Sequence, residues 1–326
     1  MRESAFVLLR ATFYRWMQLW PERCPSLDEA PHVIGVGDLH LENFGTWRDS
    51  DNRLIWGVND VDEACRIPYT LDVVRLAVSA LLANREGHFA ITVRSACDAI
   101  LDGYASSIDA GGKAFVIEHK HEWLRTAALT RALEPERVQR YWAKLTSGEP
   151  ATGQVPRHKL RAQLPNPDAP CTFKHRVTGV GSLGRQRFVA ISTGRDRDPA
   201  AREAKAVLPS AAAWARNEKR PGIYIKDLLS YAVRVPDPCF VVSRRWMIRR
   251  LAPDCARIEL GDLPAERDEL KLLRAMGWET ANMHLGSKRR KIARHLATLP
   301  HRWLEQAAEE MASATTEDFR TWVAGR

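Results

Sequence analysis

The feature that most constrains this chain is a cluster of polar residues between two apolar runs near its start. The stretch VIGVGDLHLENFGTW, residues 33–47, places Asp38 and Asn43 in one short loop. A second apolar run, LIWGV, leads into NDVDEA, which contains Asp60 and Asp62. Loops positioned by a rigid scaffold carry a large share of binding and catalytic groups. We therefore expect a functional site on a hairpin in this part of the chain.

The residue types of this cluster suit magnesium and phosphoryl transfer. Mg²⁺ prefers oxygen ligands, keeps several waters and borrows further ligands from substrate phosphates. Phosphoryl transfer needs a metal clamp, a positioned nucleophile and a base. Asp38 is a candidate for the base, because an Asp that is not bound to metal can accept the hydroxyl proton. Each of these residues alone is more often a turn or helix cap, so the prediction depends on the whole set.

Residues 1–165 are predicted to be mainly helical. Apolar residues at helical spacing from Phe6 to Trp16 predict an opening helix, which we expect Pro21 and Pro25 to end. GTWRDSDNRLIWGV predicts a hairpin with its turn at Asp-Ser-Asp-Asn. TLDVVRLAVSALLA predicts a helix directly after the polar cluster.

A β-rich region, residues 166–262, is predicted after a connector at 147–170 that is rich in proline. FKHRVTGVGSLGRQRFVAISTG predicts a strand, a Gly-rich turn and a strand, and AREAKAVLP predicts a further strand that carries Lys205. CFVVSRRWMIRRLAP predicts two more strands. Helical patterning returns over residues 263–326.

The Gly-rich turn and the lysine strand are candidates for nucleotide binding. GxGxxG alone is a weak signal, and a dinucleotide-binding turn requires a helix directly after the glycines. Here RQRFVAIS follows, which favours a hairpin. A Gly-rich hairpin over phosphates with a strand lysine is the protein-kinase arrangement. The residues expected to bind ATP are Gly179, Gly181, Ser182, Gly184 and Lys205.

The polar cluster resembles the catalytic half of the kinase-like fold, especially its aminoglycoside-phosphotransferase and choline-kinase branch. The shared pattern is GD-x-H-x-x-N, a hairpin, (N)D-x-D and a helix that begins near Asp72. The resemblance implies that Asp38 and His40 belong to the catalytic loop and that Asp72 braces this loop. It also implies a set of metal ligands, namely Asn43, Asp60 and Asp62.

The order of these segments resembles a circularly permuted kinase. Only 37 residues precede Asp38, too few for a nucleotide-binding lobe, and the helix LLRAMGWETANMHLGS, which resembles the pre-catalytic helix, comes late. We expect an α+β, two-lobed fold with the helical catalytic lobe first, the β-sheet lobe second and C-terminal helices returning to the first lobe. Lys205 and Asp60 should then share one cleft. His284–Leu285 should lie beside Val33–Gly35.

The layout is also similar to a bacterial family called domain of unknown function 2252. SAFVLLRATFYRW, GDLHLENFG, NDVDEA, GVGSLG, KAVLPS and RRLAPD match its landmark segments in order. This chain departs from the family pattern in two ways. Relatives carry additional residues ahead of the first helix. Relatives also have K-E-A in the lysine strand, where this chain reads E-A-K-A with Glu203 two positions before Lys205. No partner acid for Lys205 is evident, and Glu218 and Asp227 are candidates. The resemblance to this family implies a site that binds a nucleotide and a metal and catalyses group transfer. It does not specify the substrate.

Composition narrows the class of partner. The formal net charge of +9 favours anionic partners, and the basic segments 243–250 and 287–295 are interpreted as solvated strand ends and helix faces. No apolar run approaches the roughly 18 residues of a membrane span, and no signal peptide is evident. The six cysteines form no CxxC pair, which favours reduced thiols in a cytoplasm. No nucleic-acid recognition motif is evident.

The leading prediction is an ATP- and Mg²⁺-dependent phosphotransferase that acts on a small-molecule or protein hydroxyl. Transfer of AMP is an alternative, because it needs the same Asp, Asn and Lys. A non-catalytic nucleotide-binding protein is a third possibility. The presence of Asp38, Asn43, Asp60 and Lys205 together argues against it.

Overall fold

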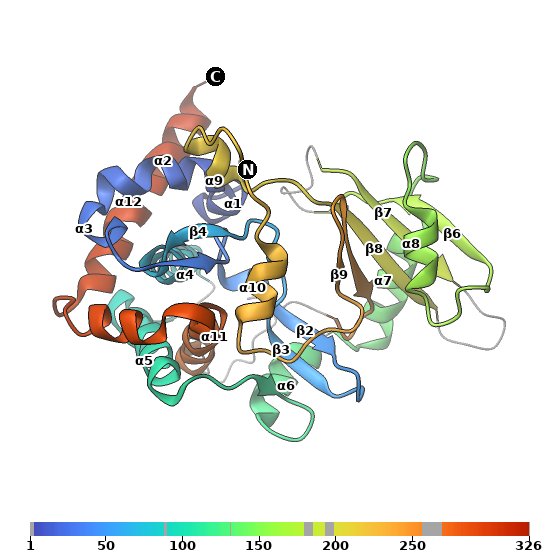
Figure 1. Cartoon of the computed structure of the whole chain (residues 1–326), viewed down its shortest axis with the longest axis horizontal. Coiled ribbons are helices and arrows are strands. Elements are labelled where there is room, and N and C mark those ends of the chain that lie inside the picture. The colour runs from blue at the N-terminus through green and yellow to red at the C-terminus, as the bar shows by residue number, and fades with distance from the viewer. Residues whose placement is uncertain are drawn as a thin grey trace.

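The computed structural model describes residues 3–87, 90–130, 132–178, 185–192, 199–255 and 269–325. Within these ranges the chain forms an α+β structure with thirteen helices and three small antiparallel sheets. A helical body occupies one side of the molecule and a five-stranded sheet the other (Figure 1). None of the described helices combines the length and the apolar character that crossing a bilayer requires.

The helical body is built around α4 (Tyr69–Arg85), in which every side chain from Tyr69 to Ala83 is buried. A helix that is buried on all sides has to be covered by other elements of the fold. The other helices of the body are α1 (Ala5–Ala11), α2 (Phe13–Arg23), α3 (Pro25–Asp28), η1 (Leu41–Asn43), α5 (Val93–Ala110), α6 (Glu122–Leu129), α9 (Ala211–Ala215), α10 (Ile225–Tyr231), α11 (Glu269–Leu296) and α12 (Trp303–Ala324).

Two glycines allow α5 and α11 to pack with their backbones in contact. A Cβ on Gly277 of α11 would lie 2.0 Å from the carbonyl oxygen of Ile100, and one on Gly103 of α5 would lie 1.9 Å from that of Arg274. Neither position accepts a larger side chain without separation of the helices. The stripe of Leu273, Gly277 and Ala281 on α11 is therefore packed against a helix from the first half of the chain.

Two small sheets carry the polar cluster. β1 (His32–Gly35) pairs with β4 (Cys65–Pro68), and β2 (Phe44–Arg48) pairs with β3 (Leu54–Val58), which also pairs with β5 (Phe115–Val116). The predicted hairpin is confirmed. Oδ1 of Asp49 accepts hydrogen bonds from the backbone N–H of Asp51 at 3.0 Å and of Arg53 at 2.8 Å, which fixes the turn.

The third sheet has the order β6-β7-β8-β10-β9 and is antiparallel throughout. Its strands are β6 (Cys171–His175), β7 (Arg187–Ser192), β8 (Ala200–Ala206), β9 (Val241–Val242) and β10 (Trp246–Leu251). On the outer face, Phe188, Ala204 and Ile248 pack against Leu160 of α8 (Arg157–Ala162). The opposite face, here called the inner face, faces the helical body.

One end of the inner face is apolar and is covered by α7 (Pro135–Thr146). Leu145 of this helix packs against Val189, Ala201 and Leu251. The charged side chains of this face are Arg187, Glu203, Lys205 and Arg249. In contrast to α7, the helices α9 and α10 follow the lysine strand in the chain but pack on α2 and α11 of the helical body. A helix from the first half of the chain, α7, thus packs on the five-stranded sheet. Two helices that follow β8 in the chain, α9 and α10, pack on the helical body.

Several local expectations are corrected. The opening helix is two helices, because the backbone of Thr12 leaves helical geometry (φ −130°, ψ 47°) and its hydroxyl donates to the carbonyl oxygen of Leu8. Pro21 lies inside α2 instead of ending it, and Pro25 begins α3. The connector contains the helix α8.

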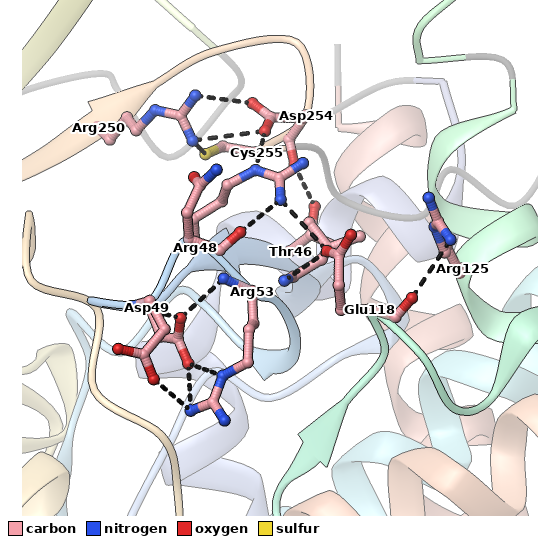
Figure 2. Close-up of polar contacts among 12 residues, drawn as sticks. Thr46, Arg48, Asp49, Arg53, Glu118, Arg125, Arg250, Asp254 and Cys255 are labelled. Atoms are coloured by element: carbon pink, nitrogen blue, oxygen red, sulfur yellow. Dashed lines mark hydrogen bonds and ion pairs between the residues drawn. The ribbon is translucent and has the colours of Figure 1, made fainter.

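A polar network joins the end of β10 to the β2–β3 hairpin (Figure 2). Nε of Arg48 lies 2.7 Å from Oδ2 of Asp254, and the hydroxyl of Thr46 donates to the carbonyl oxygen of Asp254 at 2.7 Å. Arg250 and Glu118 extend the network from either side, at 3.1 Å from Asp254 and 3.3 Å from Arg48. These contacts fix the orientation of the five-stranded sheet relative to the hairpin that carries the polar cluster.

Candidate active site

A cleft of about 1120 Å³ separates the inner face of the five-stranded sheet from the helical body. Its walls contain all of the described residues that the sequence nominated for the site, namely Asp38, His40, Asn43, Asp60, Asp62 and Lys205. The remaining nominated residues, Gly179, Gly181, Ser182 and Gly184, lie outside the described residues. The residues predicted for catalysis and metal binding therefore line the same cleft as Lys205, which was predicted to bind the nucleotide.

Asp72 holds the segment that leads into the Asp38 loop. Its buried carboxylate accepts the backbone N–H of Val36 at 2.7 Å and of Gly37 at 2.9 Å. Gly37 has a φ of +82°, and a Cβ there would lie 2.4 Å from the carbonyl oxygen of Glu63. A glycine is therefore required before Asp38. The brace that the resemblance implied for Asp72 is present.

Asp38 forms an ion pair with Arg75 of α4. The side chain of Arg75 is fully buried between the rings of Phe13 and Trp16, with its Cζ 5.1 and 4.9 Å from their centroids, and its Nη2 also donates to the carbonyl oxygen of Leu9. Burial raises the pKa of Asp38 to about 7, while Arg75 opposes this rise. A carboxylate with a pKa near neutrality is suited to proton transfer at neutral pH.

His40 and Asn43 fix the shape of the loop between Asp38 and β2. The backbone N–H of His40 donates to Oδ1 of Asn43 at 2.6 Å, and Nδ1 of His40 accepts the backbone N–H of Glu42 at 3.2 Å. The backbone N–H of Asn59 donates to the carbonyl oxygen of Asn43 at 2.9 Å, which places Asp60 next to the loop. His40 thus caps η1 in addition to lining the cleft.

Lys205 is paired with the acidic segment from the other side of the cleft. Its Nζ lies 3.6 Å from Oδ1 of Asp60 and also forms a close ion pair with Oδ2 of Asp62. Burial would raise the pKa of Asp60, but Lys205 and Arg249 outweigh it and hold this pKa below its ordinary value. Asp62 also binds Nη1 of Arg185 at 2.6 Å.

The partner acid of Lys205 was not found by sequence reasoning. The sequence candidates were Glu218 and Asp227, whereas the carboxylates that contact Lys205 among the described residues are Asp60 and Asp62. These acids come from the segment that was nominated for metal binding. The sequence did offer a signal for this pairing, because the segment NDVDEA is acidic and the strand that carries Lys205 is basic.

Sequence reasoning also missed a group of arginines on the inner face. Glu203 is fully buried and interacts with three guanidinium groups, those of Arg176, Arg187 and Arg249. Burial would raise the pKa of Glu203, but these arginines hold it well below its ordinary value. The interpretation of segment 243–250 as solvated is wrong for Arg249, whose Nε donates to Oε2 of Glu203 at 2.7 Å.

The acidic side of the cleft offers oxygen donors of the type that Mg²⁺ prefers. Asp60 and Asn43 are brought together by the pairing of the two loops, and the carboxylate of Asp60 is one-third exposed. In the described part of the chain, no group of three or more His, Cys, Asp or Glu residues is arranged to hold a metal. The residues therefore suit a metal that takes few protein ligands and completes its shell with phosphate and water.

Comparison with known proteins gives one match. Residues 1–149 match the model of a family described as an uncharacterized protein conserved in bacteria, DUF2252. The chain is similar to DUF2252 over this part of its length. The matched part includes the Asp38 loop, the hairpin, Asp60, Asp62 and Asp72, whereas Lys205 lies beyond it. Searches of curated proteins and of solved structures gave no match.

Proposed function

We propose that this chain is an ATP- and Mg²⁺-dependent phosphotransferase with a circularly permuted kinase-like fold. The observation that carries the proposal is the approach of Nζ of Lys205 to within 3.6 Å of Oδ1 of Asp60. Lys205 lies 145 positions after Asp60 in the chain (205 − 60), yet both line the cleft that also contains Asp38 and Asn43. A lysine, an acidic metal segment and a partly buried Asp in one cleft are the parts that phosphoryl transfer requires.

In this proposal Asp38 is the base. Its raised pKa matches the pH at which a cytoplasmic enzyme works, and its ion pair with Arg75 fixes the direction of one carboxylate oxygen. The other oxygen is available to accept the proton of an acceptor hydroxyl. Deprotonation by Asp38 leaves the acceptor oxygen as the nucleophile that attacks the terminal phosphorus of ATP, and the bond from this phosphorus to the bridging oxygen breaks as ADP leaves.

Asn43 and Asp60 would hold the magnesium ion, with Asp62 divided between this site and Lys205. When bound, Mg²⁺ would neutralise charge on the nucleotide phosphates. Lys205 would bind a phosphate oxygen once the nucleotide competes with Asp60 and Asp62 for its ammonium group. The hydrogen bonds that Asp72 accepts from Val36 and Gly37 keep the Asp38 loop in place during these exchanges.

Adenylyl transfer is a second candidate. It is favoured by the additional cations on the inner face, because Arg187 and Arg249 extend the positive wall of the cleft beyond Lys205. A phosphate chain bound along this wall would present its α-phosphate, instead of its terminal phosphate, to the acceptor. The same Asp38 would then serve as base.

The test is incubation of the full chain with ATP, Mg²⁺ and a metabolite and protein extract, followed by mass spectrometry. We expect products that are heavier by a phosphoryl group, whereas products heavier by an adenylyl group would establish the second candidate. Asp38→Asn should lose the products, and Asp51→Asn, on the exposed hairpin turn, should retain them. If neither product forms but the chain binds Mg·ATP, it is a non-catalytic nucleotide-binding protein.

A further inference from the structure

We propose that Arg187 and Arg249 form a phosphate-binding subsite on the inner face of the sheet, beside Lys205, for a phosphate of a polyphosphate chain. The strand register brings these side chains to one face. Arg187 of β7 is paired with Lys205 of β8, and Arg249 of β10 is paired with Glu203, two residues before Lys205. Both arginines line the cleft.

Glu203 acts as the buried counter-ion that positions the arginines. It is not among the residues that line the cleft, because the guanidinium groups of Arg176, Arg187 and Arg249 lie between its carboxylate and the open space. One carboxylate cannot neutralise three guanidinium groups. A buried acid with an excess of arginines around it is a preorganised anion site, because the arginines are held in place before a ligand arrives.

The hydrogen bonds of Arg187 are incomplete. Its side chain is only 6% exposed, its Nη1 is 3.6 Å from Oε1 of Glu203, and its Nε has no hydrogen-bond partner among the described residues. Buried donors without acceptors are costly, so such a guanidinium signals an acceptor that is bound in the functional state. A phosphate in the cleft would supply this acceptor, because its oxygens match the fork of an arginine.

The charges around the subsite leave room for an anion. The cations at this wall are Arg176, Arg185, Arg187, Lys205 and Arg249, and the carboxylates that pair with them are Asp60, Asp62, Glu63 and Glu203. The cations exceed the carboxylates by one, five against four, before any metal binds. A neutral nucleobase placed here would desolvate the guanidinium groups without giving them a negative charge, so the wall favours phosphate over a nucleobase.

The subsite deepens the proposed function, because it states where a phosphate chain runs. It does not depend on transfer chemistry, since anion binding can be measured without metal or acceptor. The ligand with this chemistry is either the nucleotide itself or a phosphorylated acceptor. Competition between two probes distinguishes these two sources.

The experiment is isothermal titration of the full chain with inorganic tripolyphosphate in EDTA at fixed, moderate salt. Arg187→Gln should weaken binding by roughly ten- to a hundredfold, the effect of losing one charge-assisted hydrogen bond. Arg244→Gln makes the same charge change on the exposed bend between β9 and β10 and should leave the affinity within about twofold. Circular dichroism and thermal unfolding of each variant establish that it is folded.

Glu203→Gln should change the affinity for tripolyphosphate in the direction opposite to Arg187→Gln. Misfolding lowers affinity and cannot imitate an increase. The amide oxygen of the glutamine can still accept a hydrogen bond from the arginines, but the competing negative charge is gone, so tripolyphosphate should bind more tightly, by about tenfold. Weaker or unchanged binding by this variant, or equal effects of Arg187→Gln and Arg244→Gln, would overturn the subsite. If ATP displaces tripolyphosphate, the subsite takes the nucleotide's phosphates, and if both bind together, it takes those of the acceptor. Loss of transfer activity with intact tripolyphosphate binding would refute only the proposed function.

Discussion

Nε2 of His284 lies 2.9 Å from Oδ2 of Asp72, although 212 positions separate the two residues in the chain. Asp72 in turn accepts the backbone N–H groups of Val36 and Gly37. The second half of α11 is therefore joined to the segment that leads from β1 to Asp38. The proposed circular permutation predicts this contact, because the corresponding helix of an unpermuted chain would run directly into this segment.

Asp72→Asn should reduce the free energy of unfolding by about 3 kcal/mol, because a fully buried carboxylate that accepts three hydrogen bonds would be replaced by an amide with one acceptor oxygen. The measurement is urea denaturation followed by circular dichroism. Asp98→Asn on the exposed face of α5 is the control and should change stability by less than about 0.5 kcal/mol. Equal stabilities of the two variants would show that the brace is not important.

Asp60→Ala should abolish Mg²⁺-dependent binding of ATP and leave the fold intact. The reason is that Asp60 and Asn43 line the same cleft on two loops joined by a backbone hydrogen bond, while Asp62 is already engaged by Arg185 and Lys205. Calorimetry with ATP in the presence of Mg²⁺ and in EDTA separates the metal-dependent part of the affinity. Unchanged Mg·ATP affinity together with normal turnover would remove Asp60 from the metal site.

Asp38→Asn should leave ATP binding nearly unchanged and reduce the rate of transfer. A positioned general base contributes about 10²- to 10⁴-fold to rate, so a loss in this range is expected. The amide retains the shape of the side chain and can still accept a hydrogen bond from Arg75. Single-turnover kinetics under saturating ATP measures the effect, and wild-type turnover by this variant would exclude Asp38 as the base.

The sequence predicted the parts of the fold that depend on local patterns. The hairpin between Phe44 and Val58, the helix after it and the lysine strand all have clear periodicity and turn chemistry, and the structure contains each of them. The break at Thr12 could not be predicted, because apolar spacing continues across it from Leu9 to Phe13. Periodicity reports which face is buried and does not report a change of helix direction.

The site was only partly predictable, because its missing members come from buried charge pairing between distant strands. Asp38, Asn43 and Asp60 stood out as a local cluster. Arg187 and Arg249 did not, since a basic residue in a strand is usually solvated and only the register with β8 places them beside Glu203. Glu203 stood out in the sequence as a departure from the resemblance to DUF2252, and its role needed three-dimensional contacts.

Arg75→Met should shift the pH dependence of transfer to higher pH. Burial raises the pKa of Asp38 to about 7, and Arg75 at present limits this rise, so its removal should raise the pKa by about one to three units. Because a base must be deprotonated, the acid limb of the rate profile would move upward by the same amount. The variant will also lose stability, since the buried guanidinium bonds Leu9 and stacks on Phe13 and Trp16. A profile that is lowered without a shift would contradict the assignment.

Glu279 makes folding sensitive to pH near neutrality. Glu279 is 1% exposed. Its carboxylate accepts a hydrogen bond from a side-chain N–H of Asn282 at 2.8 Å and one from the backbone N–H of Val58 at 3.2 Å. Val58 is the last residue of β3 and lies two positions before Asp60 in the chain. Burial raises its pKa to about 7. Between about pH 4.5 and 7 the folded state therefore holds a proton that the unfolded state has lost. The free energy of unfolding should fall as the pH rises through this window, by about 3 kcal/mol in total.

Glu279→Gln should flatten this part of the stability curve. The variant cannot lose a proton, so the difference between its unfolding free energy and that of the wild type should grow by about 3 kcal/mol from pH 4.5 to pH 7.5. Any constant offset from altered hydrogen bonds leaves this slope unaffected, and the contribution of Asp38 is common to both proteins. Urea denaturation at half-unit pH intervals provides the curves, with Glu310→Gln as an exposed control that should run parallel to the wild type. Parallel curves for Glu279→Gln would mean that this carboxylate is ionised in the folded protein throughout the range.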